Sequence, residues 1–205
     1  PYRDALEREL PEGYNPETLR IARQWARETP GAEAVANRLL QLFNQSFVYT
    51  LEPPGLGRDS VDEFLWGTRR GFCEHYAAAF VTLMRIAGIP ARVVTGYQGG
   101  EYNPVGNYWL VRQSDAHAWV EVWLPLLGWW RVDPTAAVAP ERVEHSINTA
   151  LSQNSDQVVF SIDDPGLIGA LWRNAAWLAD AVDLGWHRWV VGFSADRQGS
   201  LLEMV

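Results

Sequence analysis

Residues 70–80 of the 205-residue chain read Arg-Gly-Phe-Cys-Glu-His-Tyr-Ala-Ala-Ala-Phe, and the pattern that begins here decides the fold. Apolar residues recur at helical spacing from this point onward, at Ala77, Phe80, Met84 and Ala87. Gly88 and Pro90 then end the pattern, because glycine readily ends a helix and proline cannot continue one. The stretch therefore predicts a helix that begins at or near Cys73.

The residues after Pro90 change to a pattern typical of β-strands. The segments with this pattern are rich in β-branched and aromatic residues and cover 91–97, 108–112, 116–124 and 129–133. Strands joined by short loops favour an antiparallel sheet. We therefore expect an α+β fold in which the helix from Cys73 packs on an antiparallel sheet.

The segments that flank this unit are expected to be helices and loops. Asn15-Pro16-Glu17 is typical of a helix start, with asparagine as the cap and proline at the first helical position. Ser60 and Glu63 have the spacing of a capping box, which predicts a short helix there. The remaining expectations are a helix over 32–43, a polar surface loop over 140–157 and a helix over 167–191.

Composition excludes several classes of protein. The length fits one domain. The net charge of −8 argues against nucleic acid as the main partner, because phosphate binding requires a basic surface. No apolar run reaches the roughly 18 residues that suggest a transmembrane helix, and one cysteine excludes an internal disulfide. All 17 basic residues are arginines, so this segment cannot supply a lysine amine to its own site.

Cys73 is the candidate nucleophile. Gly71-Phe72 is a plausible turn, so the thiol is expected at or near the N-terminus of the predicted helix. The unpaired N–H groups and the dipole at a helix N-terminus favour a thiolate. The same N–H groups can hold the oxyanion of a tetrahedral intermediate. A lone cysteine is otherwise most often a buried structural residue.

His117 is the candidate general base among the four histidines. His75 lies two residues beyond Cys73, and residues so spaced on a helix do not face each other, so we interpret it as structural. His145 and His187 lie in polar or terminal segments, which favours a surface position. His117 begins a predicted strand, which gives it a fixed backbone.

The carboxylate that would orient His117 depends on how two predicted strands pair. If Trp123 pairs with Trp129 across a five-residue loop, Asp133 falls on the same face of the sheet as His117. If Leu124 pairs with Trp129 instead, Asp133 falls on the opposite face. We expect the first pairing, or a bulge with the same effect.

Two other carboxylates stay open as partners of the histidine. Asp115 lies two residues before His117, and Glu121 shares the face of His117. An arginine such as Arg92 or Arg131 is an alternative partner for Glu121. Strand periodicity alone does not decide among the three carboxylates.

Several motifs occur in an order that resembles a known family. The motifs are Gly-Phe-Cys at 71–73, Arg-Ile-Ala-Gly-Ile-Pro-Ala-Arg-Val-Val-Thr-Gly-Tyr at 85–97, His-Ala-Trp-Val-Glu-Val at 117–122, Gly-Trp at 128–129 and Asp-Pro-Thr at 133–135. Together they resemble the bacterial transglutaminase-like domain, and among its members the membrane-anchored bacterial transglutaminases. The resemblance covers most of the chain from about Phe47 onward.

The resemblance implies a papain-like α+β fold with Cys73 as nucleophile, His117 as base and Asp133 as orienter. It ranks Asp133 first among the carboxylates, because the family pattern falls on that residue. No acidic cluster resembles the calcium site of animal transglutaminases, so no metal and no cofactor are expected.

The resemblance also implies where the domain resides. The helical pattern of the first part of the chain predicts an N-terminal helical segment over 1–45 that packs on the catalytic core over 46–140. A polar loop and a tryptophan-rich helical segment over 141–205 would lead toward the membrane. The chain would be one domain of a larger membrane protein at the periplasmic face of the bacterial inner membrane, anchored by transmembrane segments outside this sequence. Protein or peptide substrates in the cell envelope are expected.

One triad serves two activities, which the sequence leaves open. A transglutaminase-like acyltransferase passes the acyl group of a glutamine to a primary amine, whereas a cysteine protease or amidase passes it to water. Trp66, Tyr97 and Trp119 are candidates for aromatic walls that bind substrate and exclude water. An interaction module that has kept the fold without the activity is a third possibility.

Overall fold

A computed structural model of the chain describes residues 6–140 and 176–184. The chain divides into two compact units, one of residues 1–98 and 113–147 and the other of residues 99–112 and 148–205. The predicted surface loop over 140–157 lies outside the described residues, apart from its first residue. Only 176–184 of the predicted helix over 167–191 is described, and it is helical. The boundaries of the three segments proposed from the sequence stay a prediction.

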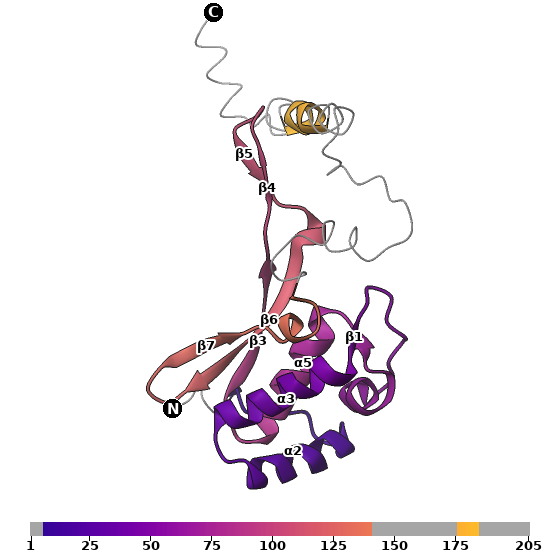
Figure 1. Cartoon of the computed structure of the whole chain (residues 1–205), viewed down its shortest axis with the longest axis vertical. Helices are drawn as coiled ribbons and strands as arrows, with labels where there is room; N and C mark the ends of the chain where they lie inside the picture. The colour runs from indigo at the N-terminus through magenta and orange to yellow at the C-terminus, as the bar shows by residue number, and fades with distance from the viewer. Residues whose placement is uncertain (1–5, 141–175, 185–205) are drawn as a thin grey trace, which may run out of the picture. The chain divides into compact units, whose positions relative to one another are not determined.

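The first unit is built around helix α5 (Cys73–Ile86), which begins where the sequence predicts. Its buried face carries Tyr76, Phe80 and Met84, each with no exposed surface. The helix ends before Gly88, whose φ of 80° is one that side chains rarely adopt. Figure 1 shows α5 between the sheet and the helices α2 (Pro16–Glu28) and α3 (Ala32–Ser46).

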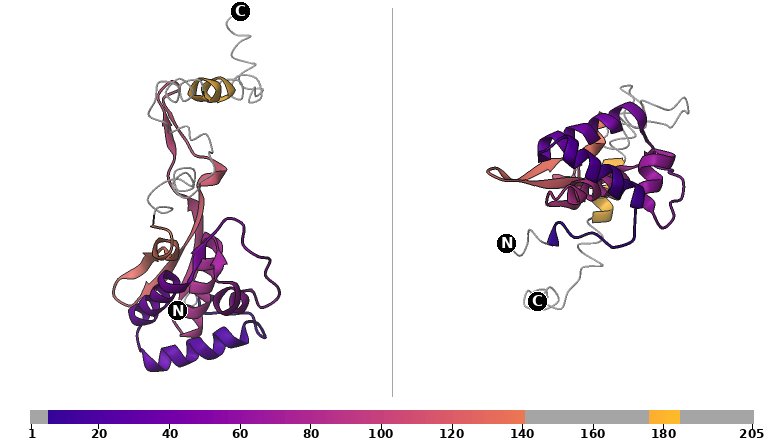
Figure 2. Two further views of the ribbon diagram at one scale, coloured as in Figure 1. Left: turned by 45° about the vertical axis from the view of Figure 1, so that its right-hand side comes forward. Right: turned by 90° about the horizontal axis from the view of Figure 1, so that it is seen from below.

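The sheet on which α5 packs has the strand order β3 (Ala91–Tyr97), β6 (Ala116–Leu124) and β7 (Gly128–Val132). Both pairings are antiparallel, as predicted. Val120 and Val122 point from the central strand into the core, where they are 0% and 2% exposed. The β6–β7 hairpin extends beyond the helices of the first unit in both views of Figure 2.

Short elements complete the first unit. Four aromatic rings, those of Phe43, Phe47, Phe64 and Tyr76, contact one another at centroid distances of 5.0 to 6.3 Å. Strand β1 pairs in parallel with β2 immediately before α5. The short elements are β1 (Val48–Tyr49), α4 (Ser60–Asp62), the π-helical turn η1 (Glu63–Thr68), β2 (Arg70–Gly71) and the 3₁₀ turns η2 (Gln113–Asp115) and η3 (Pro134–Ala137).

One strand prediction needs correction. The segment 108–112 does contain a strand, β5 (Tyr108–Leu110), but β5 is not part of the main sheet. It pairs instead with β4 (Glu101–Asn103), its neighbour along the chain, in a separate hairpin. Composition identifies a strand because its residues favour extended backbone, but composition does not identify the partner.

The second unit contains this hairpin and the helix over 176–184. Glu101 accepts hydrogen bonds from Arg112 Nη1 and from Trp177 Nε1, each at 2.6 Å. Asn103 Nδ2 donates to the carbonyl oxygen of Trp177 at 2.9 Å. These polar contacts hold the helix to the hairpin.

The N-termini of α2 and α4 cap each other, which the local sequence does not reveal. The Asn15 side chain accepts from the N–H groups of Val61 and Asp62 at 3.0 and 3.2 Å and so caps α4. The Asp62 carboxylate in turn accepts from the N–H groups of Glu17 and Thr18 at 2.9 and 2.7 Å and so caps α2. Asn15 therefore caps a different helix from the one predicted, and Ser60 makes no side-chain cap.

We predict that Asn15→Ala and Asp62→Ala each lower the free energy of unfolding by about 1 kcal/mol, the usual contribution of a helix cap. The double variant should lose less than the sum of the two, because both caps hold the same pair of helices. Urea unfolding followed by circular dichroism measures this, with Gln41→Ala on the exposed side of α3 as the control. Additive losses would contradict the coupling.

Candidate active site

Cys73 is the first residue of α5 and is only 9% exposed. The turn before it is tightly packed, because a Cβ atom at Gly71 would lie 2.8 Å from His75 and 2.9 Å from Phe64. Nδ1 of His75 also accepts a 3.4 Å hydrogen bond from the N–H of Phe72. His75 therefore supports the turn that carries the thiol, as its interpretation as a structural residue predicts.

His117 is the second residue of β6 and is 3% exposed. Its neighbour across the sheet is Gly96 of β3. A Cβ atom at position 96 would lie 2.9 Å from the ring of Trp119, so only glycine leaves room for this indole. The rings of His117 and Trp119 lie 6.3 Å apart and are close to parallel, at 22°. Gly96 is thus a site residue that the sequence analysis did not single out.

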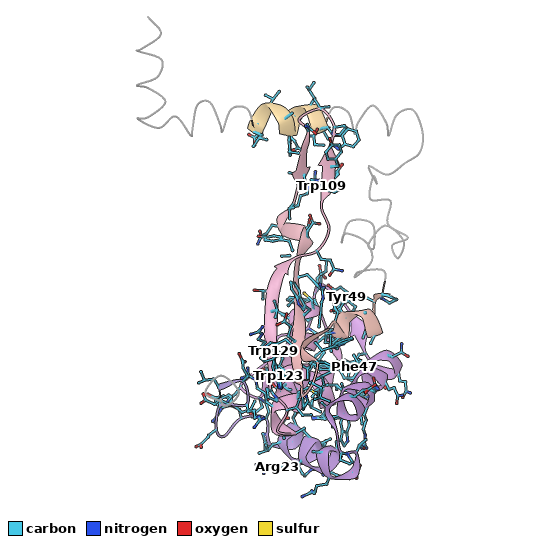
Figure 3. All side chains as sticks on the ribbon, turned by 90° about the vertical axis from the view of Figure 1, so that its left-hand side faces the viewer. Arg23, Phe47, Tyr49, Trp109, Trp123 and Trp129 are labelled. Carbon is cyan, nitrogen blue, oxygen red and sulfur yellow. The ribbon has the colours of Figure 1, made fainter. Side chains whose placement is uncertain are left out.

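Asp133 follows directly after β7, and the register of β7 brings it to His117. Trp123 pairs with Trp129, as predicted, and Figure 3 shows these two side chains next to each other on the hairpin. The additional pair of Leu124 with Gly128 shortens the loop but keeps Asp133 on the same face as His117. The strand pairing required for a His117–Asp133 contact is present.

The His117–Asp133 contact is a short hydrogen bond. Nε2 of His117 donates to Oδ2 of Asp133 at 2.7 Å, and the Asp133 side chain is 9% exposed. The second carboxylate oxygen, Oδ1, accepts from the N–H of Thr135 at 3.1 Å, so Asp133 also caps the turn η3. Both carboxylate oxygens are therefore fixed, and His117 is left with Nδ1 for the thiol.

The electrostatics of His117 favour the protonated ring. Burial by itself lowers the pKa of His117, but the hydrogen bond to Asp133 and the interactions with Cys73 and with the charge of Asp133 outweigh burial and raise the pKa to about 9. The imidazolium therefore stabilises the folded state below pH 6.5, the ordinary pKa, and this contribution is lost as the pH rises through about 9. An imidazolium beside a thiol also favours the thiolate.

The other two carboxylates weighed from the sequence have different surroundings. Glu121 accepts two hydrogen bonds from Arg92, from Nε at 2.8 Å and from Nη2 at 2.6 Å. Asp115 is buried in the turn η2, and its backbone carbonyl accepts from the N–H of Gln98. Neither carboxylate has the direct bond to His117 that Asp133 has.

The three predicted aromatic residues lie in different environments. Trp119 is on the face of His117, beside its ring. Tyr97 pairs with Ala116, one position from His117, so its side chain leaves the sheet on the other face, where its hydroxyl group bonds Gln113. Trp66 donates from Nε1 to Oγ1 of Thr18 at 3.1 Å, which fixes it to α2. Substrate contact stays a prediction for all three.

Neither a metal-binding cluster nor a membrane-spanning helix occurs among the described residues. Within 6–140 and 176–184, His, Cys, Asp and Glu side chains form no group of three or more that would hold a metal ion. Over the same ranges, no helix has the length and apolar character needed to cross a bilayer.

Comparisons with known proteins agree with the resemblance seen in the sequence. The model of the transglutaminase-like superfamily matches residues 20–134. Protein-glutamine gamma-glutamyltransferase of Pseudomonas aeruginosa is 48% identical over 198 residues, which are 95% of this chain and 30% of that protein. The uncharacterized protein YebA of Bacillus subtilis is 43% identical over 101 residues, which are 46% of this chain and 14% of that protein.

A solved structure is similar as well. The crystal structure of the periplasmic domain of TgpA from Pseudomonas aeruginosa superimposes with a TM-score of 0.69 and 51% sequence identity. The superposition covers 75% of this chain and 52% of that one. The chain thus spans about half of the solved relative and 30% of the first curated relative. The predicted fold is confirmed, with helices packed on an antiparallel sheet.

We predict that iodoacetamide alkylates Cys73 rapidly well below pH ~8.5, where a free thiol is mostly protonated and slow to react. The reason is that the His117 imidazolium persists to about pH 9. The measurement is the alkylation rate against pH, followed by mass spectrometry. In His117→Ala the rate should follow a free thiol, and a wild-type profile of that form would rule out the ion pair.

Proposed function

Because this chain belongs to the transglutaminase-like superfamily, we propose that it is the catalytic domain of a protein-glutamine acyltransferase. The observation that carries the proposal is the 2.7 Å bond between His117 and Asp133, in a site where the other partner of the imidazole is Cys73. A thiol at a helix N-terminus, an imidazole and an orienting carboxylate are the parts that nucleophilic acyl transfer needs.

The first half of the proposed reaction forms a thioester. The Cys73 thiolate attacks the carbonyl carbon of a glutamine carboxamide, and the resulting oxyanion lies near the N-terminus of α5, where helix N–H groups favour negative charge. His117 gives its proton to the leaving nitrogen, the carbon–nitrogen bond breaks, and ammonia departs. The acyl group is then bound to sulfur, and His117 is neutral.

The second half regenerates the enzyme. A primary amine attacks the thioester, neutral His117 takes a proton from that amine, and the carbon–sulfur bond breaks to release the Cys73 thiolate. The products are a substituted amide and the starting thiolate–imidazolium pair. Asp133 holds the ring in the orientation that both halves need, and it stabilises the imidazolium present at the beginning and the end.

Hydrolysis is the alternative outcome of the same thioester. If water attacks in place of the amine, the chain acts as an amidase or a cysteine protease. The aromatic wall at Trp119, which stacks beside the base, supports transfer because it removes the imidazole from bulk water.

We further propose that the domain works in the bacterial periplasm on protein or peptide substrates of the cell envelope, as part of a larger, membrane-anchored protein. The support is the similarity to a periplasmic domain, with 51% identity to that of TgpA. The net charge of −8 is in keeping with substrates other than nucleic acid.

The deciding experiment incubates a glutamine-containing donor peptide with a primary amine and follows the products by mass spectrometry, with Cys73→Ala as the control. We expect incorporation of the amine, with loss of ammonia, that depends on Cys73. Deamidation or cleavage of the peptide that depends on Cys73, with no amine incorporated, would overturn transfer in favour of hydrolysis.

We predict that Asp133→Ala lowers kcat by roughly 10³- to 10⁴-fold, the scale seen when the orienting carboxylate of a triad is lost. Iodoacetamide should still alkylate Cys73 in this variant, because the thiol remains at the start of α5. Glu121→Gln is the control, since that carboxylate binds Arg92 instead of His117. Full turnover in Asp133→Ala would show that the orienting group is elsewhere.

A further inference from the structure

The proposed chemistry gives no role to Arg131, a charged residue beside the hydrogen-bonded pair of His117 and Asp133. Arg131 lies in β7, directly across the sheet from Glu121 and two residues before Asp133. Alternation along the strands places it on the same face as His117 and Trp119. Its side chain is 54% exposed, so solvent reaches the guanidinium.

The guanidinium of Arg131 is held in place by a ring. Its Cζ atom lies 4.5 Å from the centre of the Trp119 indole, which is a stacking contact of the cation–π type. The indole is in turn fixed between the His117 ring and the backbone of Gly96. The contact limits the freedom of the planar group, so less of it is lost when the group binds a partner.

The one acid that pairs with Arg131 among the described residues is Asp133, and this ion pair is long and has no hydrogen bond. Glu121, its partner by register, is occupied by two hydrogen bonds from Arg92. Oδ2 of Asp133 lies 3.7 Å from Nη2 of Arg131, which is longer than a hydrogen bond, and both oxygens of Asp133 have other donors. In the part of the chain that the structure describes, no other carboxylate is within salt-bridge distance of Arg131.

The neighbouring Arg92 differs from Arg131 in its acid partner. Arg92 also stacks on a tryptophan, with its Cζ atom 4.1 Å from the centre of the Trp129 ring, but its charge is matched by Glu121. Arg131 has the same kind of support, but its ion pair with Asp133 is longer, at 3.7 Å, and is not a hydrogen bond. An oriented, exposed guanidinium presents a fork of N–H donors that fits a carboxylate.

We propose that Arg131 selects acceptor amines that carry a carboxylate on the same molecule. This inference rests on the acyl transfer proposed above. The acceptor must give its proton to His117, so it approaches on the side of the imidazole, and Trp119 and Arg131 lie on that face of the sheet. The acyl donor is bound to Cys73, at the start of α5. Lysine is the natural test acceptor, because its primary amine and its carboxylate are on one molecule.

The test compares two acceptors that differ only in this charge, Nα-acetyl-lysine and Nα-acetyl-lysinamide. Both present the same primary amine, and only the first has a free carboxylate. We expect wild type to prefer the acid by about three- to tenfold in kcat/KM, mainly through a lower KM, the scale of one partly exposed charge-assisted contact. Added salt should reduce the preference.

Arg131→Gln should bring the ratio of the two kcat/KM values close to 1, and Arg131→Lys should retain part of the preference, because it keeps the charge and loses the fork. The matched control is Arg20→Gln, which removes an arginine that pairs with Glu17 on the exposed side of α2 and should leave the preference as in wild type.

Two results would overturn the inference. Equal use of the acid and the amide by wild type would remove selection by charge. If Arg131→Gln lowered kcat/KM equally for both acceptors, Arg131 would instead have a role in supporting Asp133. Failure to incorporate either amine, with deamidation that depends on Cys73, would overturn the transfer reaction itself and is distinguishable from both.

Discussion

The register between β6 and β7 is the constraint on which the candidate site depends. The pairing of Trp123 with Trp129 puts Asp133 on the face of His117, and a slip of one residue would send it to the other face. The core favours this register, because Val132 of β7, which pairs with the buried Val120, packs against the core. Full burial of a valine side chain contributes about 1.5–3 kcal/mol, so a slip that turned the half-buried Val132 to the other face is disfavoured.

The core also sets the relation between the thiol and the imidazole, which belong to different elements. Helix α5 packs through Tyr76, Phe80 and Met84, and this packing determines where its first residue lies. The tight turn at Gly71 allows Cys73 to follow strand β2 directly. The nucleophile and the base therefore meet because the hydrophobic faces of their two elements are packed together, not because any local motif joins them.

The outer face of the sheet has a different organisation, in which arginines stack on tryptophans. Trp129 with Arg92 and Trp119 with Arg131 are two such pairs on neighbouring positions of the sheet. Glu121 lies between the arginines and binds only Arg92. Because Glu121 binds Arg92, Arg131 keeps only its long ion pair with Asp133 and an exposed guanidinium, which makes it a candidate binding group.

The helix near Cys73 and the strand of His117 could be predicted from the amino-acid sequence, because both follow from apolar periodicity within single segments. The face on which Asp133 lies was expected correctly, but it depends on the pairing of two strands, and periodicity left two pairings open. It did not determine the partner of β5, the exchange of caps between Asn15 and Asp62, or the choice of Glu121 between two arginines. It also gave no sign that Gly96 makes room for Trp119. Each of these contacts joins residues whose separation along the chain carries no periodic signal, so packing and the competition of donors for acceptors in the folded chain settle them.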